Sequence, residues 1–291
     1  MDFKFFLQEI VIIPAMIILF SGLTAFLRAS IQPERMKSAL ARVQGPFGYL
    51  IGSLLGAITP FCSCASVPIF MGIAQLRSTD KAGAAFSFLI TSPLVNEVAF
   101  VMIWQLFGAN IALFYLSFSL ILGILGGWLA DLLGMGKELI GSGENMPSIY
   151  MRSVKHRLQY ALWDSTQILK KTMPMLLVGI LIGSWLHNRE IPNLEAILLN
   201  SHGWWAVILA TLVGIPLYSS IAVGIPIAFG LINQGLALGT GMAFLLAVAG
   251  LSLPELVMLK GVMSKKLLVA FTTYVAMGIM GAGYVLNLSF L

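Results

Sequence analysis

The sequence predicts an all-α polytopic membrane protein built from two inverted-topology repeats, each with a broken or re-entrant helical hairpin. Of its 291 residues, 58% are hydrophobic and only 10% are charged, whereas a soluble domain has about 25% charged residues. Long apolar runs recur along the chain, and a membrane span needs about 20 such residues. These runs are continuous rather than alternating, which excludes a transmembrane β-barrel.

The apolar runs set the order of the expected spans. The first run lacks a basic start and a cleavage site, so we interpret it as a retained span rather than a signal peptide. With two runs long enough to hold a hairpin, the chain is expected to have about eight full spans plus two hairpins, or ten spans. The runs cover 10–26, 47–74, 83–104, 109–130, 173–187, 203–234, 239–259 and 267–287.

The basic residues favour a topology with two returning segments. If every run crosses once, the 17 basic residues divide 8 against 9 between the two sides, which shows no preference. If 47–74 and 203–234 each return to the face they entered, only Lys4 and Arg189 lie opposite the other 15. The positive-inside rule makes the richer face cytoplasmic. We therefore predict a multi-pass protein of the inner or plasma membrane with both termini outside the cytoplasm.

Prolines mark where the predicted hairpins and helices break, because proline removes a backbone donor and clashes with the preceding turn. Two lie in each hairpin, and one interrupts each of the runs that follow. The predicted breaks are Pro60, Pro68, Pro93, Pro216, Pro226 and Pro254.

The two halves also resemble each other in sequence at an offset of 158 residues. We interpret residues 1–133 as the first transmembrane repeat and 172–291 as the second, inverted one. Inverted repeats with broken helices at the midplane are typical of secondary transporters. The matched pairs are Pro68 with Pro226, Gly72 with Gly230, Gly83 with Gly241, Phe86 with Phe244, and Glu97 with Glu255.

The polar stretch 134–171 connects the halves and is expected on the cytoplasmic side. Apolar residues such as Leu158 and Leu162 alternate there with basic ones such as Lys155. This pattern predicts an amphipathic helix on the cytoplasmic leaflet, while a plain solvated connector is the alternative. Neither version implies catalysis.

The first predicted hairpin carries two thiols at its tip, Cys62 and Cys64. Irregular backbone at membrane depth is tolerated where it is buried in protein or lines a cavity, and thiolates prefer soft metals and metalloids. The pair therefore predicts a soft binding surface, completed by Ser63 and Ser66. The alternative is that both cysteines are small buried hydrophobes.

Two acidic residues, Glu97 and Glu255, follow prolines inside apolar runs. An intramembrane carboxylate is costly and usually faces a cavity or a partner, so both are candidates for solute binding or proton coupling. The alternative is a structural role, with each Glu bonded to backbone freed by the opposite hairpin. Further polar residues expected at the site are Asn96, Tyr218, Ser219 and Ser220.

Several other functions lack support in the sequence. The 15 methionines are scattered, and His156, His187 and His202 have no metal-ligand spacing, so neither a metal site nor another cofactor is expected. No phosphate-binding loop is present, and no nucleophile–base arrangement indicates an enzyme. The net charge of +5 is attributed to membrane orientation rather than to nucleic acid.

One segment carries a family resemblance. The stretch from Pro60 to Pro68, followed by 83–89 and 92–96, resembles the predicted permease family that includes the organoarsenical efflux permease ArsP and YraQ-like permeases. In that family a glycine commonly follows the second cysteine, where this chain has Ala65. The resemblance implies efflux of trivalent organoarsenicals, with Cys62 and Cys64 as candidate ligands.

The sequence thus favours a secondary active permease that exports a small, soft or thiol-seeking solute, with proton coupling as an option. Its expected partners are the lipid bilayer and that solute, and a homo-oligomer or an accessory membrane subunit stays open. One alternative is a passive channel or a membrane subunit of a larger complex. Another is a transmembrane thiol–disulfide conduit, although the second half has no cysteine.

Overall fold

The structure is a computed structural model in which the described residues are almost all helical. Within them, extended pairing occurs at an isolated antiparallel bridge between Leu139 and Met263. The predicted all-α class is confirmed for this part of the chain. The description covers Phe26, Thr166, Lys170 and residues 45–58, 63–76, 82–95, 97–139, 153–156, 158–163, 204–216 and 221–289.

Two sets of helices follow each other along the chain in the same order. The first set is α3 (Pro46–Ile58), α4 (Ser63–Leu76), α5 (Gly83–Leu94), α6 (Glu97–Phe107) and α7 (Ala109–Leu132), followed by the short 3-10 helix η1 (Met135–Glu138). The second set is α10 (Trp205–Gly214), α11 (Ile221–Asn233), α12 (Leu238–Gly250), α13 (Leu253–Lys260) and α14 (Lys265–Ser289).

Two of these helices, α7 and α14, are long and apolar enough to cross a membrane. The pair formed by α5 and α6 adds a third candidate if it is taken as one span bent by 51°. Helices α3, α10 and α12 are apolar but shorter. Apart from Phe26, the predicted runs 10–26 and 173–187 lie outside the described residues, and the count of eight to ten spans stays a prediction.

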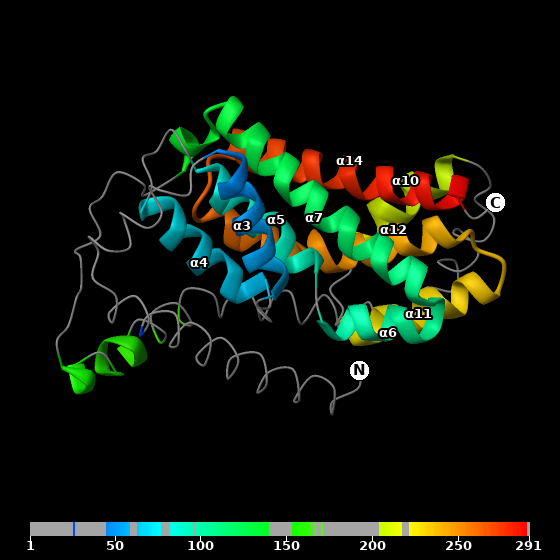
Figure 1. Cartoon of the computed structure of the whole chain (residues 1–291), viewed down its shortest axis with the longest axis horizontal. Coiled ribbons are helices and arrows are strands. Elements are labelled where there is room, and N and C mark those ends of the chain that lie inside the picture. The colour runs from blue at the N-terminus through cyan, green and yellow to red at the C-terminus, as the bar shows by residue number, and fades with distance from the viewer. Residues whose placement is uncertain are drawn as a thin grey trace.

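The two sets pack in the same way (Figure 1). In the first half, α5 contacts α3, α4 and α7, and α7 also contacts α3 and α6. In the second half, α12 contacts α10, α11 and α14, and α14 also contacts α10 and α13. Each contact of one half therefore has its counterpart in the other.

A matching hydrogen bond fixes the register between the two sets. The backbone N–H of Gly83 donates to Oδ1 of Asp131 over 2.6 Å, and that of Gly239 donates to Oδ1 of Asn287 over 2.7 Å. Both bonds join residues 48 positions apart. In this region the offset between the halves is therefore 156 residues (83 to 239, and 131 to 287).

This register corrects part of the alignment predicted from the sequence, which paired Gly83 with Gly241 and Phe86 with Phe244. The offset of 158 holds at the starts of α4 and α11, at residues 63 and 221. It changes because the connection after α11, 234–237, is two residues shorter than the connection 77–82 after α4. At the offset of 156, Glu97 at the start of α6 matches Leu253 at the start of α13. Glu255 lies two positions after Leu253, so the predicted match of Glu97 with Glu255 does not hold in this register.

The halves contact each other in reciprocal pairs. Helices α7 and α14 run antiparallel, because Tyr274 on α14 donates to the carbonyl oxygen of Leu122 over 2.8 Å while Met263 bridges to Leu139. Helix α6 packs against α11, and α13 packs against α4. Exchanging the halves turns one of these last two contacts into the other.

Glycines allow the close packing of α5 on α7 and of α12 on α14. A Cβ on Gly127 would overlap the carbonyl oxygen of Gly83, and one on Gly239 would overlap the carbonyl oxygen of Gly283. Both obstacles are backbone atoms of the facing helix, which cannot rotate away. Small residues at such positions let helices approach closely in membranes.

Replacing Gly127 with Ala should destabilise the protein by about 1–3 kcal/mol, because overpacking forces the two helices apart. The matched control is Gly281→Ala on α14, where an added Cβ would meet nothing within 4 Å. The control should be neutral or slightly stabilising, since Ala is a better helix former than Gly. Thermal unfolding of the purified variants in detergent measures both, and equal midpoints would contradict the packing argument.

Candidate functional site

The structure describes some of the predicted site residues more fully than others. Ser63 and Cys64 lie in the first turn of α4, and Glu97 begins α6; for these three only the backbone is described. Ser66 and Glu255 are described with their side chains, and both are buried. Outside the described residues lie Pro60, Cys62, Asn96, Tyr218, Ser219 and Ser220.

The prolines lie beside the breaks more often than at them. Pro68 and Pro226 lie within α4 and α11, each five residues after the helix begins, so the breaks predicted at these two positions are not found there. A proline so near a helix start forfeits one hydrogen bond to the first turn and leaves the rest intact. Pro93 is inside α5 just before its end, Pro254 is in the first turn of α13, and Pro216 follows α10.

Helix α3 runs parallel to α5. Gly52 on α3 lies against the carbonyl oxygen of Ala84, and Gly56, one turn further on, lies against that of Phe88. The C-terminal end of α3 is therefore directed toward the C-terminal end of α5.

Helix α4 runs the other way across α5. Ser66 and Ser92 share a hydrogen bond of 2.7 Å, and the rings of Phe70 and Phe86 meet edge-on at 5.1 Å. The chain therefore reverses between α3 and α4, and the first turn of α4, which holds Cys64, lies at the C-terminal end of α5. The two helices have 13 and 14 residues, so each is about 20 Å long, shorter than a hydrocarbon core of about 30 Å.

The second half has the same arrangement around α12. A Cβ on Gly224 of α11 would contact Leu245, and one on Gly241 of α12 would contact Ile232. These contacts make α11 antiparallel to α12, with the start of α11 at the C-terminal end of α12.

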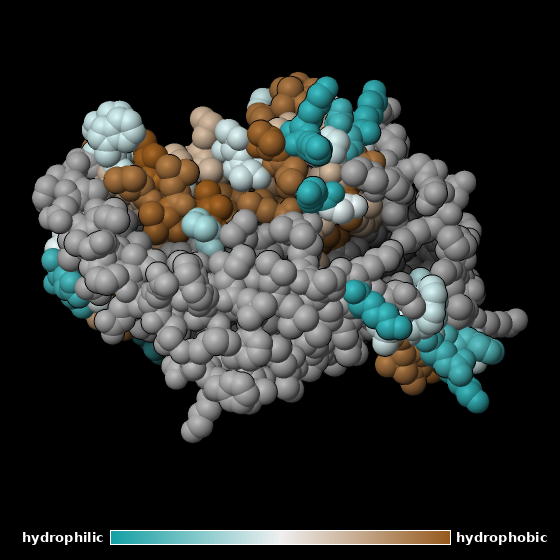
Figure 2. Space-filling view, turned by 180° about the vertical axis from the view of Figure 1, so that it is seen from behind, coloured by the Kyte–Doolittle hydropathy of each residue, from teal (hydrophilic) through white to brown (hydrophobic). Residues whose placement is uncertain are grey.

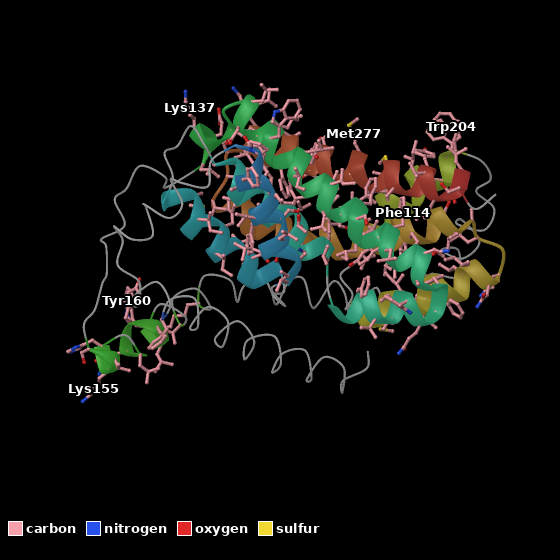
Figure 3. All side chains as sticks on the ribbon, in the orientation of Figure 1. Phe114, Lys137, Lys155, Tyr160, Trp204 and Met277 are labelled. Atoms are coloured by element: carbon pink, nitrogen blue, oxygen red, sulfur yellow. The ribbon has the colours of Figure 1, made fainter. Side chains whose placement is uncertain are left out.

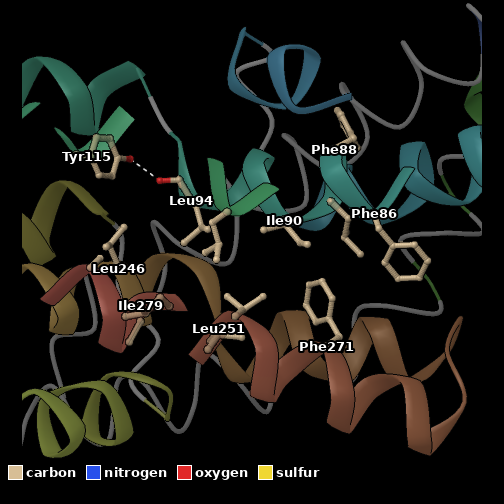
Figure 4. Packing of buried hydrophobic residues seen from close by; sticks show 14 of the residues in the cluster. Phe86, Phe88, Ile90, Leu94, Tyr115, Leu246, Leu251, Phe271 and Ile279 are labelled. Carbon is tan, nitrogen blue, oxygen red and sulfur yellow. Dashed lines mark hydrogen bonds between the residues drawn. The ribbon is translucent and has the colours of Figure 1, made fainter. Parts of the chain in front are cut away.

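These ends meet at one place, which we call the central junction. Leu94, the last residue of α5, contacts Gly250, the last residue of α12. The starts of α4 and α11 therefore come together with the breaks that precede α6 and α13. The central junction comprises Ser66, Ser92, Leu94, Gly250, Ser252 and Glu255, and Figure 4 shows the packing around Leu94 and Leu251.

The polar groups of the central junction are concentrated where α4 meets α13. Ser66 is 0% exposed, Ser92 2% and Glu255 1%, and helix α13, which carries Glu255, packs against α4. The reciprocal contact of α6 with α11 is aromatic, with Phe107 and Phe229 edge-on at 5.4 Å. The Phe107–Phe229 pair lies far along α6 and α11 from the helix starts at the junction. The buried polar side chains Ser66, Ser92 and Glu255 therefore lie on the side of the junction formed with α4 and α13.

A tyrosine that the sequence analysis did not single out supports the first break. The hydroxyl of Tyr115 on α7 donates to the carbonyl oxygen of Leu94 (Figure 4). At the offset of 156 its counterpart in the second half is Phe271, which has no hydroxyl. In the sequence, Tyr115 is a polar residue inside the apolar run 109–130, which could have indicated a buried hydrogen bond. Its acceptor, the carbonyl oxygen of Leu94, can be identified only once the end of α5 is located.

The hydrogen bond between Ser66 and Ser92 is also confined to the first half. Its counterparts are Gly224 and Val248, which cannot form it. The two halves therefore have the same helix contacts but differ in the side-chain hydrogen bonds that stabilise them. Within the described ranges, no three His, Cys, Asp or Glu side chains are grouped as metal ligands.

The chain is similar in sequence to known proteins. The profile of the ArsP_1 family, described as predicted permease, matches residues 4–288. A curated relative, the UPF0718 protein MJ0584 of Methanocaldococcus jannaschii, is 21% identical over 277 residues, which covers 75% of each chain. No solved structure matches the chain.

Replacing Tyr115 with Phe should lower stability by about 1–3 kcal/mol, because it leaves the buried carbonyl of Leu94 without its donor. The matched control is Tyr284→Phe, which removes an exposed hydroxyl bonded to the carbonyl oxygen of Trp204. The loss of the Tyr284 hydroxyl should lower stability little, because at the surface another donor can bond to the carbonyl oxygen of Trp204. Thermal midpoints in detergent compare the two, and a control shift as large as that of Tyr115→Phe would contradict the assignment.

Proposed function

Because this chain belongs to the ArsP_1 family of predicted permeases, we propose that it is a secondary active permease whose solute passes through the central junction. The family and the apolar helices support a membrane protein that acts as a transporter rather than an enzyme. The observation that carries the proposal is the meeting of two reversed helix pairs at one buried point with hydroxyls and a carboxylate.

The proposed mechanism uses the two halves as inverted repeats that rock around the junction. The antiparallel α7 and α14 and the reciprocal contacts between the halves support this relation. Inverted repeats of this kind alternate access around a fixed central site. In the proposed topology, the pairs α3–α4 and α10–α11 enter the bilayer from opposite faces, residues 134–171 are cytoplasmic, and both termini are outside.

We further propose that the solute is soft and thiol-seeking, of the trivalent organoarsenical class, and that it is exported. The support is the place of Cys64 in the first turn of α4, two residues before the buried Ser66 at the junction. Cys62 precedes it by two residues, and thiolates prefer such metalloids. The hydroxyls of Ser63, Ser219 and Ser220, with Tyr218 and Asn96, would complete the contact.

We propose that Glu255 couples transport to protons, with Glu97 of the first half as a second candidate carboxylate. Glu255 is buried in the first turn of α13, where the helix dipole favours a negative charge. A carboxyl group in this position can hold a proton in one conformation and release it in the other. The charge of Glu255 then changes at the contact between the halves, so that proton binding and release are coupled to the rocking movement.

Uptake of a trivalent methylarsenical into everted membrane vesicles tests the solute. Cys62→Ser and Cys64→Ser should each lower the initial rate at least tenfold, because a hydroxyl does not replace a thiolate for arsenic. Thr272→Ala, which removes a bond within α14 to the carbonyl oxygen of Leu268, is the control and should transport normally. Full activity of the Cys62→Ser/Cys64→Ser variant would rule out thiol contact.

An imposed pH gradient tests the coupling separately. The wild type should accumulate solute above equilibrium in proportion to the gradient, and a protonophore should abolish the accumulation. Glu255→Gln should equilibrate the solute without accumulating it, since the amide cannot exchange a proton. Wild-type flux that ignores the gradient would instead indicate a passive channel.

A further inference from the structure

We propose that an anionic phospholipid binds where the first half of the chain passes into the second, at a surface made by both. We call this surface the basic end and define it by Lys137, Lys260, Lys265 and Lys266. The proposal depends on the chain being in a membrane and not on which solute it carries.

The basic end is a built junction of two segments rather than a chance group of lysines. The backbone N–H of Ser264 donates to the carbonyl oxygen of Glu138 over 3.0 Å, and Leu139 forms the bridge with Met263. These contacts tie η1 to the connection between α13 and α14, so Lys137 from one half is held beside lysines from the other.

The charge of the basic end is strongly one-sided. All four lysines are exposed, and Glu138 is the neighbouring acid within the tied segments, which leaves an excess of about three positive charges. Lys265 and Lys266 begin α14, and its first turn contains no acidic residue. The positive end of the helix dipole therefore adds to their charge instead of offsetting it. An anion at this surface relieves the repulsion.

Apolar side chains lead away from the lysines along both long helices. Leu132 at the end of α7 is 66% exposed, Leu133 60%, and Val269, one turn beyond Lys265 on α14, 65%. Figure 2 shows hydrophilic side chains projecting beside hydrophobic surface, and in Figure 3 Lys137 and Trp204 lie at opposite ends of the layer of α7 and α14.

This combination fits a phospholipid better than a free anion. A headgroup phosphate can contact the lysines while its acyl chains cover Leu132, Leu133 and Val269. Lysines near an anionic membrane surface are attracted to it, so the basic end selects phosphatidylglycerol or a similar lipid over a zwitterionic one. Because the lysines come from both halves, the bound lipid also holds the halves together at this end.

The test uses the purified full chain in detergent, supplemented with phosphatidylglycerol, phosphatidylcholine or inorganic phosphate. Phosphatidylglycerol should raise the thermal midpoint by several degrees, and the other two should not. The triple variant Lys137→Gln/Lys265→Gln/Lys266→Gln should lose at least half of that shift. The matching Lys→Arg triple variant should keep it.

Native mass spectrometry provides a second readout that does not depend on unfolding. The wild type should retain phosphatidylglycerol at a protein-to-lipid ratio at which the triple Gln variant retains at least tenfold less. An equal shift with phosphatidylcholine, a full shift with inorganic phosphate alone, or unchanged retention by the Gln variant would each overturn the proposal. These results leave the transport proposal untouched, since no arm measures flux.

Discussion

The arrangement of the helices depends on satisfying backbone polar groups where helices end inside an apolar environment. Lipid offers no hydrogen bonds, so an interrupted helix must find its partners within the protein. The chain meets this need at the end of α5, where the carbonyl oxygen of Leu94 accepts from Tyr115 and Ser92 bonds to Ser66. The break is thereby tied to α7 on one side and to α4 on the other, which explains why three helices converge on one point.

The second half repeats this backbone plan with different chemistry. Gly239 and Asn287 reproduce the bond between Gly83 and Asp131 with an amide in place of a carboxylate, so the geometry tolerates a change of charge. At the break itself the hydroxyls are replaced by Phe271, Gly224 and Val248. The two sets of helices therefore keep the same contacts, although Ser66, Ser92 and Tyr115 have no hydroxyl counterparts in the second set.

Much of the fold followed from patterns that lipid imposes on a sequence. The all-α class and the repeated order of helices were predictable because apolar runs and matched residues are visible directly in the sequence. The lysines at 137, 260, 265 and 266 were assigned to one face by charge alone, and the contacts of Glu138 and Leu139 with 263–264 bring their segments together.

The remaining features depend on details that leave no periodic signal. A connection shortened by two residues shifted the register from 158 to 156, and loop length does not alter hydropathy. The prediction of helix breaks at Pro68 and Pro226 was wrong because both lie inside helices. A sequence does not show how far a proline lies from the start of its helix. Tyr115 has its partner 21 residues earlier, so its role depends on how α7 packs against the end of α5. The roles of Cys62, Cys64, Glu97 and Glu255 remain predictions.

The two breaks differ in their side-chain hydrogen bonds, and this difference affects how the helices can move. Directional bonds from Ser66 and Tyr115 resist bending of the first break, whereas Phe271, Gly224 and Val248 cannot supply the matching bonds in the second half. We expect strain introduced where Leu94 meets Gly250 to displace α11 and α12 more than α4 and α5. Helices α4 and α5 then act as the fixed reference for that movement.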